Sequence, residues 1–475
     1  MHKLENKTKI VATLGPASSN KAVLKTMIES GVNVCRINFS HGSYEAHQEV
    51  INTIHEINDE LNSNTGILTD LQGPKIRIGE LKDNGFVIND GDILNFTTDK
   101  IIGTKELIYI NYKDFPKDVK PGEKILIDDG KLMLEILETN NEDKVRAVVL
   151  HGGNLSSKKG VNLPNTKISL PCITPKDEED LVFALENDVS WIALSFVRSA
   201  NDIHELRAKI QAAGKTSQII AKIEKPEAIE NLEEIIEAAD GCMVARGDLG
   251  VEIPMQDVPL WQKQIVRICQ RKSKPVIIAT QMMESMIISI SPTRAEVNDV
   301  ANAVLDGADA VMLSGETSVG KFPIEVIKAM YKIIIRIERK GDIYFKKIEA
   351  DPDPNRIISD IICESATKMA KKGKAKAIIT MSFSGYTGYK LSSYRPDSDI
   401  YVFTANKGIL NTLSLAWGVR GIYYDKFVST DHTMDDIRFI LKQKGCVVEG
   451  DIIINIASMP IASKGMSNMM KMSVV

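Results

Sequence analysis

The chain has 475 residues, of which 43% are hydrophobic and 26% are charged, an ordinary balance for a globular protein. At roughly 150 residues per domain, this length allows about three domains. The formal net charge of -4 provides no broad basic face, which argues against general nucleic-acid binding. No apolar stretch reaches the ~18 residues that a membrane span needs. The six cysteines form no CxxC pair and the first residues carry no apolar signal region, so we expect no disulfides and a cytoplasmic location.

Short apolar runs alternate with segments of helical periodicity, three of them before residue 75 and five after residue 170. Parallel strands that helices cover on both faces read as such continuous runs. Nearly every run ends in polar or charged residues, which is typical of a barrel with chemistry at the carboxyl ends of its strands. The sequence therefore predicts a (β/α)8 TIM barrel of the α/β class. Its predicted strands are Thr8–Gly15, Asn33–Ser40, Gly66–Leu71, Trp191–Val197, Gln218–Glu224, Cys242–Arg246, Pro275–Gln281 and Ala310–Gly315.

The region from residue 75 to residue 170 interrupts this rhythm. It contains short β-rich pieces separated by turn signals such as Asp128-Asp129-Gly130, and no convincing long helix. We therefore predict a small β-barrel domain over 75–170, inserted into a discontinuous barrel domain of residues 1–74 and 171–342. The predicted pieces are Gly85–Ile88, Leu107–Tyr112, Lys124–Ile127, Leu132–Leu137 and Lys144–Leu150.

A second alternation of strands and helices follows a plausible linker, Asp351-Pro352-Asp353-Pro354. It predicts an open α/β domain with a largely parallel sheet over 355–475. Helices are expected at Ile357–Lys371 and Met434–Lys444. The predicted strands are Ala377–Met381, Ile400–Phe403, Gly421–Tyr424 and Asp451–Ile456.

The densest polar ending is Ala221-Lys222-Ile223-Glu224, at the end of one predicted barrel strand. Residues two apart in a strand point the same way, so Lys222 and Glu224 should project side by side. A structural ion pair is the alternative interpretation. A strand that ends at a barrel mouth favours an active-site cleft, because both groups then face the ends of the other strands.

Asp248 follows the next strand, within Arg246-Gly247-Asp248-Leu249-Gly250, where two glycines allow the backbone to approach a ligand. Glu224 and Asp248 come from adjacent strands and could together hold one hard divalent cation. Mg²⁺ uses few carboxylates together with water and substrate oxygens. A lysine beside such an ion fits phosphoryl transfer. The seven histidines are dispersed and suggest no zinc site.

The amino-terminal half contributes an unusually polar strand, in which Arg36, Asn38 and Ser40 alternate and share one face. Together with His41 and Arg77, this face predicts a site for nucleotide phosphates. A buried hydrogen-bond network is the alternative interpretation.

Three further residues are weaker candidates. Lys159, at the exit of the inserted domain, could contact a phosphate, although a two-lysine run also suits a solvated surface. Thr280 and Ser314 end the last two barrel strands. Their hydroxyls could orient a carboxylate or a water there, or could simply belong to turns and caps.

In their order along the chain, these segments resemble the pyruvate kinase family over essentially the whole length. Each motif is weak alone, but the ordered set is highly specific. The motifs are TLGPAS at 13–18, RINFSHG at 36–42, DLQGPKIR at 70–77, KGVNLP at 159–164, AKIE at 221–224, MVARGDLG at 243–250, ATQM at 279–282, PTRAE at 292–296 and MLSGET at 312–317.

The resemblance implies that a homotetramer transfers a phosphoryl group from phosphoenolpyruvate to ADP, giving pyruvate and ATP in the last step of glycolysis. It implies that Glu224 and Asp248 bind Mg²⁺ or Mn²⁺, and that Lys222 neutralises the transferring phosphoryl and the developing enolate. The inserted domain would close as a lid that excludes water. The residues implied are Lys222, Thr280, Arg36 and Ser314 for catalysis, Lys222, Gly247, Asp248, Thr280 and Arg36 for substrate binding, and Arg36, Asn38, His41, Arg77 and Lys159 for nucleotide binding.

One departure concerns the monovalent cation that many family members bind. Asn38, Ser40, Asp70 and Leu71 resemble the potassium ligands, but the run after the aspartate reads Leu-Gln-Gly-Pro-Lys instead of Thr-Lys-Gly-Pro-Glu. We expect the Lys75 ammonium to replace the missing positive charge, so that K⁺ is not required. The alternative is that Lys75 points to solvent and K⁺ still binds.

The carboxyl-terminal domain carries residues that resemble the family's phosphate-binding loop for an allosteric sugar phosphate. Hydroxyls and backbone amides can hold a phosphate there. An aromatic residue, Tyr386, stands where some members have a basic residue, so the identity of an effector, and whether one exists, are open. The residues are Thr380, Ser382, Ser384, Gly385 and Thr387.

Two other functions fit parts of the pattern. Another magnesium-dependent TIM-barrel enolate lyase or aldolase would need the carboxylate pair, but not Arg36, Arg77 or the β-insertion. A non-catalytic sugar-phosphate sensor would be free to lose catalytic residues, and all four are present: Lys222, Glu224, Asp248 and Thr280.

Overall fold

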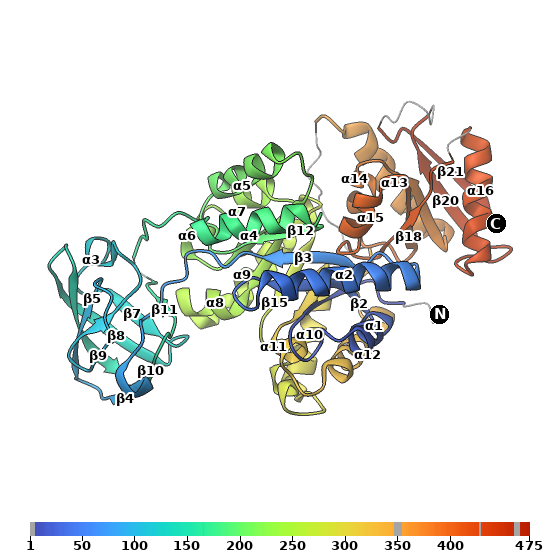
Figure 1. Cartoon of the computed structure of the whole chain (residues 1–475). Helices are drawn as coiled ribbons and strands as arrows, with labels where there is room; N and C mark the ends of the chain where they lie inside the picture. Colours follow the sequence, from blue (N-terminus) through green and yellow to red (C-terminus); the bar gives the residue numbers. More distant parts are fainter. Residues whose placement is uncertain (1–4, 165, 346–353, 427–428, 460–465) are drawn as a thin grey trace.

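The computed structural model describes residues 5–164, 166–345, 354–426, 429–459 and 466–475. Its central part is a closed barrel of eight parallel strands, as predicted, in the order β1-β16-β15-β14-β13-β12-β3-β2. Three strands precede the insertion and five follow it (Figure 1). The strands are β1 (Lys9–Thr13), β2 (Val32–Asn38), β3 (Gly66–Asp70), β12 (Trp191–Leu194), β13 (Gln218–Ile223), β14 (Gly241–Ala245), β15 (Val276–Ala279) and β16 (Ala310–Leu313).

Helices surround the barrel and bury their apolar faces against its strands. Local sequence sets several helix starts: Thr174 and Thr293 each form a capping box with the third residue of the helix. The α-helices are α1 (Lys21–Glu29), α2 (Tyr44–Leu61), α4 (Pro175–Glu186), α5 (Ala200–Ala212), α6 (Pro226–Glu230), α7 (Leu232–Ala238), α8 (Arg246–Glu252), α9 (Val258–Arg271), α10 (Arg294–Asp306), α11 (Gly315–Ser318) and α12 (Pro323–Lys340), and the 3₁₀ turns are η2 (Met255–Asp257) and η3 (Glu284–Ile287).

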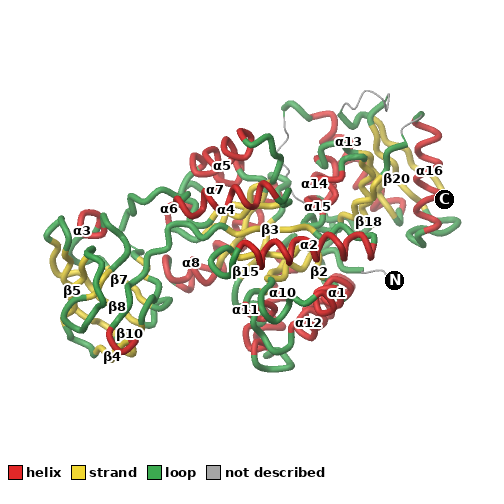
Figure 2. Tube along the Cα trace, in the orientation of Figure 1, coloured by secondary structure: helices red, strands yellow, loops and turns green. Residues whose placement is uncertain are grey.

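The regular structure of the insertion between β3 and α4 is mainly short β-strands joined by loops (Figure 2). The insertion has an apolar core of its own. Six strands form one sheet in the order β11-β7-β8-β9-β5-β6, and β10 pairs with β4. The domain limits at 74/75 and 170/171 stay a prediction. The elements are η1 (Lys82–Asn84), β4 (Gly85–Ile88), β5 (Ile93–Thr97), β6 (Ile108–Tyr109), α3 (Phe115–Asp118), β7 (Lys124–Ile127), β8 (Leu132–Thr139), β9 (Lys144–His151), β10 (Gly153–Ser156) and β11 (Val161–Asn162).

The carboxyl-terminal part is an α/β sheet in the order β19-β18-β17-β20-β21, parallel except for its last strand. The predicted linker falls mostly outside the described residues, which include Pro354 alone of its four. The sequence pattern did not indicate the antiparallel edge strand β21. The elements are α13 (Ile357–Gly373), β17 (Ala377–Met381), α14 (Tyr386–Ser393), β18 (Asp399–Thr404), α15 (Lys407–Leu413), β19 (Val419–Tyr423), α16 (Thr430–Gln443), β20 (Ile452–Ala457) and β21 (Met469–Val474).

The carboxyl-terminal part packs against the amino ends of the barrel strands (Figure 1). There the buried ammonium of Lys9 donates to the Val419 carbonyl at 2.9 Å, and Arg395 pairs with Asp309 at 3.0 Å. The insertion leaves from the opposite, carboxyl ends of the strands. The carboxyl-end rim therefore lies between the barrel and the insertion, away from the carboxyl-terminal part.

All six cysteines are free and buried, at positions 35, 172, 242, 269, 363 and 446. Among the described residues, no helix is both long and apolar enough to cross a membrane.

Candidate active site

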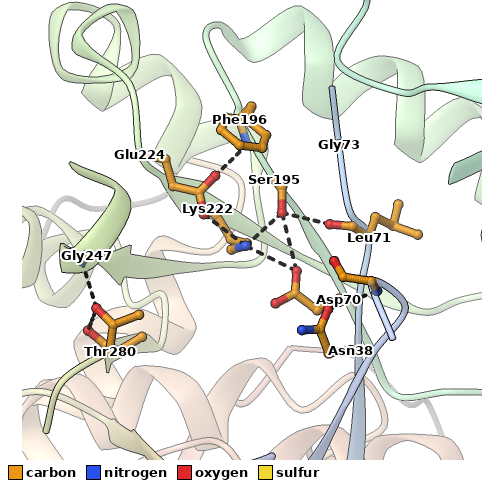
Figure 3. Close-up of polar contacts among 12 residues, drawn as sticks. Asn38, Asp70, Leu71, Gly73, Ser195, Phe196, Lys222, Glu224, Gly247 and Thr280 are labelled. Carbon is orange, nitrogen blue, oxygen red and sulfur yellow. Dashed lines mark hydrogen bonds and ion pairs between the residues drawn. The ribbon is translucent and has the colours of Figure 1, made fainter. Parts of the chain in front are cut away.

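Lys222 and Glu224 lie side by side at the carboxyl end of β13, as the sequence predicts (Figure 3). The Lys222 Nζ atom is 2.9 Å from Glu224 Oε1, and only 11% and 1% of the two side chains are exposed. The two residues therefore form an ion pair, and that pair lies at the barrel mouth, so the two interpretations of the sequence do not exclude each other. The charge of a buried lysine acts strongly on a bound anion, because the surrounding protein screens it less than water does.

Asp70, at the end of β3, completes this charged cluster. Its Oδ1 atom is 3.3 Å from Lys222 Nζ, and its Oδ2 atom accepts from Arg36 Nε at 2.8 Å and pairs with Arg36 Nη2 at 2.6 Å. Arg36 Nη1 also donates to Thr13 Oγ1 at 2.9 Å. The Arg36 guanidinium thus belongs to a buried hydrogen-bond network, next to the predicted phosphate site.

The protonation of the cluster follows from burial and charge together. Burial lowers the pKa of Lys222, but the carboxylates of Asp70 and Glu224 outweigh it and raise that pKa above its ordinary value. Burial opposes ionisation of Asp70, yet Lys222 and Arg36 hold its pKa below the usual value. Burial raises the pKa of Glu224, against the lowering effect of Lys222. Lys222 is therefore a permanent cation at neutral pH.

Gly247, Asp248 and Thr280 meet at the neighbouring strand ends. The residues after β14 form the short helix α8, which starts at Arg246. The Gly247 amide donates to Thr280 Oγ1 at 2.8 Å, and Thr280 adopts a left-handed backbone with φ of 66°. Arg246 fixes this arrangement, because it donates to the Thr280 carbonyl at 2.7 Å and pairs with Asp299 at 2.7 Å.

Glu224 and Asp248 fit a small divalent cation. The negative charge of Asp248 raises the pKa of both Lys222 and Glu224, so the Asp248 carboxylate lies in the same charged region of the site. Asp248 is half-buried, and its carboxylate has no hydrogen-bond or ion-pair partner within the described part of the chain. No described cluster of three or more His, Cys, Asp or Glu offers a larger ligand set. Two carboxylates with open coordination positions suit Mg²⁺ or Mn²⁺.

The predicted monovalent-site residues come together on β2 and β3. Asn38 lies opposite Asp70 in the strand register, as Figure 3 shows, and its Oδ1 atom accepts from the Ser40 amide at 3.1 Å. The buried Leu71 follows directly. Lys75 lies four residues further on, half-buried, in a cleft that is also lined by Lys225 and Asp248. No described carboxylate forms an ion pair with Lys75.

The predicted nucleotide-binding residues divide between two parts of the molecule. Arg36 and the exposed His41 belong to the barrel. Arg77 pairs with Gly160 across an isolated bridge beside the insertion, where Lys159 forms an ion pair with Asp128 at 2.9 Å. Within the described ranges, no hydrogen bond or ion pair joins the two groups. A nucleotide bound by both would therefore span the gap between the barrel and the insertion.

Ser314 lies at the end of β16 on the same rim, half-buried. Its amide donates to Glu316 Oε2 at 2.7 Å, which fixes the start of α11. The structure places Ser314 near the barrel mouth without a direct hydrogen bond to Thr280.

The predicted effector residues gather at the start of α14. Ser382 Oγ accepts from the Gly385 amide at 2.9 Å, and Gly385 has a positive φ of 81°. Thr387 Oγ1 lies 3.1 Å from Ser467 Oγ. Ser384 Oγ accepts from the Tyr386 amide at 3.4 Å, and Thr380 is buried in β17. The turn thus exists, but its hydroxyls are largely bonded within the fold.

Sequence reasoning missed two residues at the centre of the site, Ser195 and Phe196. Ser195 Oγ accepts from Lys222 Nζ at 2.7 Å, and the Phe196 amide donates to Glu224 Oε2 at 2.8 Å (Figure 3). The predicted strand ran through both, whereas β12 ends at Leu194. A serine at the end of an apolar run was the available signal.

A second missed contact joins the insertion to the barrel. Glu252 Oε1, at the end of α8, accepts from Lys225 Nζ at 2.7 Å and from Asn162 Nδ2 of β11 at 2.8 Å. We call these three residues the Glu252 contact. Its Asn162–Glu252 hydrogen bond joins the insertion to the barrel beside the cleft that Asn162 and Lys225 line.

Comparisons with known proteins identify the family of this chain. The model of the pyruvate kinase barrel domain matches residues 5–327, and that of the pyruvate kinase alpha/beta domain matches residues 360–473. The chain is 43% identical to pyruvate kinase 2 of Synechocystis over 99% of its own length and 80% of that protein. It is 40% identical to a pyruvate kinase of Clostridium perfringens over 98% and 99% of the two chains.

A solved structure, that of a pyruvate kinase from Cryptosporidium parvum, superposes with a TM-score of 0.93. It is 36% identical and the match covers 99% of this chain and 96% of the other. These matches span the barrel, the insertion and the carboxyl-terminal part, so the lyase or aldolase alternative is not favoured. The chain belongs to the pyruvate kinase family and is a phosphotransferase.

Proposed function

We propose that this enzyme transfers the phosphoryl group of phosphoenolpyruvate to ADP in the last step of glycolysis. The bond between phosphorus and the enolic oxygen breaks while a β-phosphate oxygen of ADP forms the new bond, and the enolate then takes a proton at its methylene carbon to give pyruvate. The buried ammonium of Lys222, held among carboxylates at the barrel mouth, carries this proposal. Its charge opposes the negative charge that develops on the phosphoryl group and the enolate.

The direct test is ATP formation from phosphoenolpyruvate and ADP with Mg²⁺, measured by luminescence. We expect ATP only when both substrates are present. No ATP under saturating substrates would contradict the proposed reaction.

Glu224 and Asp248 would hold Mg²⁺ or Mn²⁺, which when bound neutralises phosphate charge. The amides at Gly247 and Asp248, with Thr280, would bind the substrate carboxylate. Thr280 and Ser314 would orient the water that supplies the proton, and Arg36 would contact substrate and nucleotide phosphate from its fixed position beside Asp70.

Asn38, His41, Arg77 and Lys159 would complete the nucleotide site, together with Arg36. Because Lys159 lies on the insertion, ADP would bind fully only when the insertion is held over the barrel. The Glu252 contact supports such a lid, since its part-buried Asn162–Glu252 hydrogen bond links the two parts.

The lid position gives a testable prediction for Asn162→Asp. A carboxylate placed at hydrogen-bond distance from Glu252 repels it and should displace the insertion. We expect the KM for ADP to rise about five- to tenfold and the KM for phosphoenolpyruvate to change little. Asn154→Asp, on an exposed strand of the same insertion, adds the same charge and should leave both KM values unchanged. If the KM for ADP is the same in the Asn162→Asp and Asn154→Asp variants, the Glu252 contact does not hold the insertion in place for ADP binding.

Potassium independence is a further part of the proposal. Asp70 already meets two cations, Arg36 and Lys222, and Lys75, which lines the cleft together with Asp248, has no ion-pair partner among the described residues. We expect turnover in tetramethylammonium buffer to rise less than about twofold when K⁺ is added. The matched variant Lys75→Glu removes the positive charge of Lys75, so its turnover should depend strongly on K⁺. Large activation of the unchanged enzyme by K⁺ would reject this role for Lys75.

A homotetramer is proposed as the assembly. Apolar side chains are exposed on the barrel at Met255, Leu260, Ile288 and Ile290, and β21 is an edge strand with Val474 exposed. Such surfaces support association between copies. Light scattering after size exclusion would measure the assembly.

A sugar-phosphate effector and a cytoplasmic location complete the proposal. The turn of Ser382, Ser384 and Gly385 before α14, with Thr380 and Thr387 beside it, supports a phosphate site through its amides and hydroxyls. Phosphoenolpyruvate saturation curves with and without sugar phosphates would detect the effector as a shift in the half-saturating concentration.

A further inference from the structure

The turn after β12 contacts both halves of the Lys222–Glu224 pair through adjacent residues. Ser195 is buried, and its Oγ atom is 2.7 Å from Lys222 Nζ and also 2.7 Å from the Leu71 carbonyl oxygen. A serine hydroxyl has one proton, and the ammonium can only donate. The Ser195 proton can reach two acceptors, the Leu71 carbonyl oxygen at 2.7 Å and Asp70 Oδ1 at 3.4 Å, and the nearer carbonyl is the better acceptor. A lone pair of the hydroxyl then accepts from Lys222. The serine thus connects the end of β13 to the end of β3.

The Lys222 ammonium has three protons and three acceptors: Ser195 Oγ at 2.7 Å, Glu224 Oε1 at 2.9 Å and Asp70 Oδ1 at 3.3 Å. Ser195 is the nearest of the three and the uncharged one. Glu224 is also a proposed metal ligand, so its charge would be shared when a cation binds. The bond to Ser195 does not compete with a metal and keeps the ammonium in place in either state.

The turn itself is held in an unusual backbone conformation. Phe196 has a left-handed φ of 55°, which is rare for a bulky side chain, and this conformation directs its amide to Glu224 Oε2 at 2.8 Å. Gly73 packs directly against the turn: a Cβ atom there would lie 2.7 Å from Phe196 Cδ2 and 3.1 Å from Ser195 Cβ. The Gly73 amide is in turn held by Asp177 Oδ1 at 3.1 Å. The surrounding structure therefore fixes the turn.

We propose that Ser195 is a positioning residue that holds the Lys222 ammonium at the point where the phosphoryl group transfers, an inference that depends on the reaction proposed above. Ser195 does not itself contact the reacting atoms. It limits the directions in which the ammonium can move, so that the charge is in place before the transition state forms.

The test compares Ser195→Ala, Ser195→Thr and Ser190→Ala in the full-length enzyme. Ser190 is a matched control: it is buried and precedes β12 at the opposite, amino end of the same strand, where its Oγ atom accepts from the Ile67 amide at 3.4 Å. We expect Ser195→Ala to lower kcat roughly tenfold to a hundredfold, with both KM values within about twofold. The hydrogen bond that positions the ammonium is absent, and a misplaced charge stabilises the transition state less while substrate binding changes little. Ser195→Thr keeps the hydroxyl and should recover most of the kcat, and Ser190→Ala should match the unchanged enzyme.

Binding of Mn²⁺ alone, followed by paramagnetic resonance, separates positioning from general damage. The Phe196 amide, not the Ser195 hydroxyl, holds Glu224, so we expect Ser195→Ala to change the Kd for Mn²⁺ by less than about twofold. Thermal unfolding of each variant checks that it folds. A kcat within about twofold of the unchanged enzyme would overturn the proposal, and so would Mn²⁺ binding that weakens in step with kcat, or a threonine variant as slow as the alanine one.

The outcome for the unchanged enzyme keeps the two proposals apart. If it forms no ATP from phosphoenolpyruvate and ADP, the proposed reaction fails. If it forms ATP and Ser195→Ala is equally fast, only the positioning role fails.

Discussion

Replacing Lys222 with methionine is expected to lower kcat by about a thousandfold or more, because the buried ammonium supplies charge that the transition state needs more than the bound substrate does. Methionine keeps most of the length of the lysine side chain, but it has no positive charge to stabilise the negative charge that develops in the transition state. Steady-state kinetics with both substrates, together with the Kd for Mn²⁺, measure the effect. We expect the KM for phosphoenolpyruvate to change far less than kcat.

The variant also breaks a buried ion pair, so its stability has to be measured. Removing one partner of such a pair costs on the order of 3–5 kcal/mol. Lys225→Met is the matched control: Lys225 lies three residues further on and also forms a buried pair, with Glu252 at 2.7 Å. We expect similar destabilisation in thermal unfolding, but a fall in kcat of less than about tenfold. Nearly unchanged turnover in the folded Lys222→Met enzyme would remove Lys222 from its assigned role.

Asp248→Asn is expected to have the second large effect, about a hundredfold weaker binding of Mn²⁺ and a similar or larger loss of kcat/KM. The substitution keeps the shape of the side chain and removes one of two charges that would hold the ion. It breaks no described hydrogen bond or ion pair of the Asp248 carboxylate, so folding should be unaffected. Titration of the protein with Mn²⁺, followed by paramagnetic resonance, measures the binding directly.

Glu252→Gln provides the control, because it removes a buried carboxylate from the same short helix, one turn further on. We expect its affinity for Mn²⁺ to stay within about twofold of the unchanged enzyme. If Asp248→Asn binds Mn²⁺ as tightly as the unchanged enzyme, the divalent site must lie elsewhere.

Sequence pattern alone was enough for the barrel. Continuous apolar runs such as Ile219–Ala221 are buried, as expected for parallel strands that helices cover, and the polar endings of these runs favoured a closed barrel. The pairing of Lys222 with Glu224 also followed directly, because side chains two apart in a strand share a face. Local chemistry of this kind is encoded within a few residues.

Element ends were less predictable, and the site depends on them. Pattern reasoning extended the strands through Phe196 and Thr280, which instead adopt left-handed conformations just after β12 and β15. An apolar or β-favouring residue gives no local sign that its backbone will turn. Packing against Gly73 and the hydrogen bonds of Arg246 impose these conformations from other strands.

The sequence by itself determined the barrel, the inserted β-structure, the carboxyl-terminal α/β sheet and the residue types at the strand ends, because hydrophobic period and strand alternation are local properties. Only the tertiary structure decided that Ser195 meets Lys222, that Asp70 joins the same charged cluster and that Asn162 reaches Glu252. Those contacts join residues that are 27, 152 and 90 positions apart in the chain. Closure of the barrel and docking of the insertion bring them together, and no periodicity within one segment can encode such a distance.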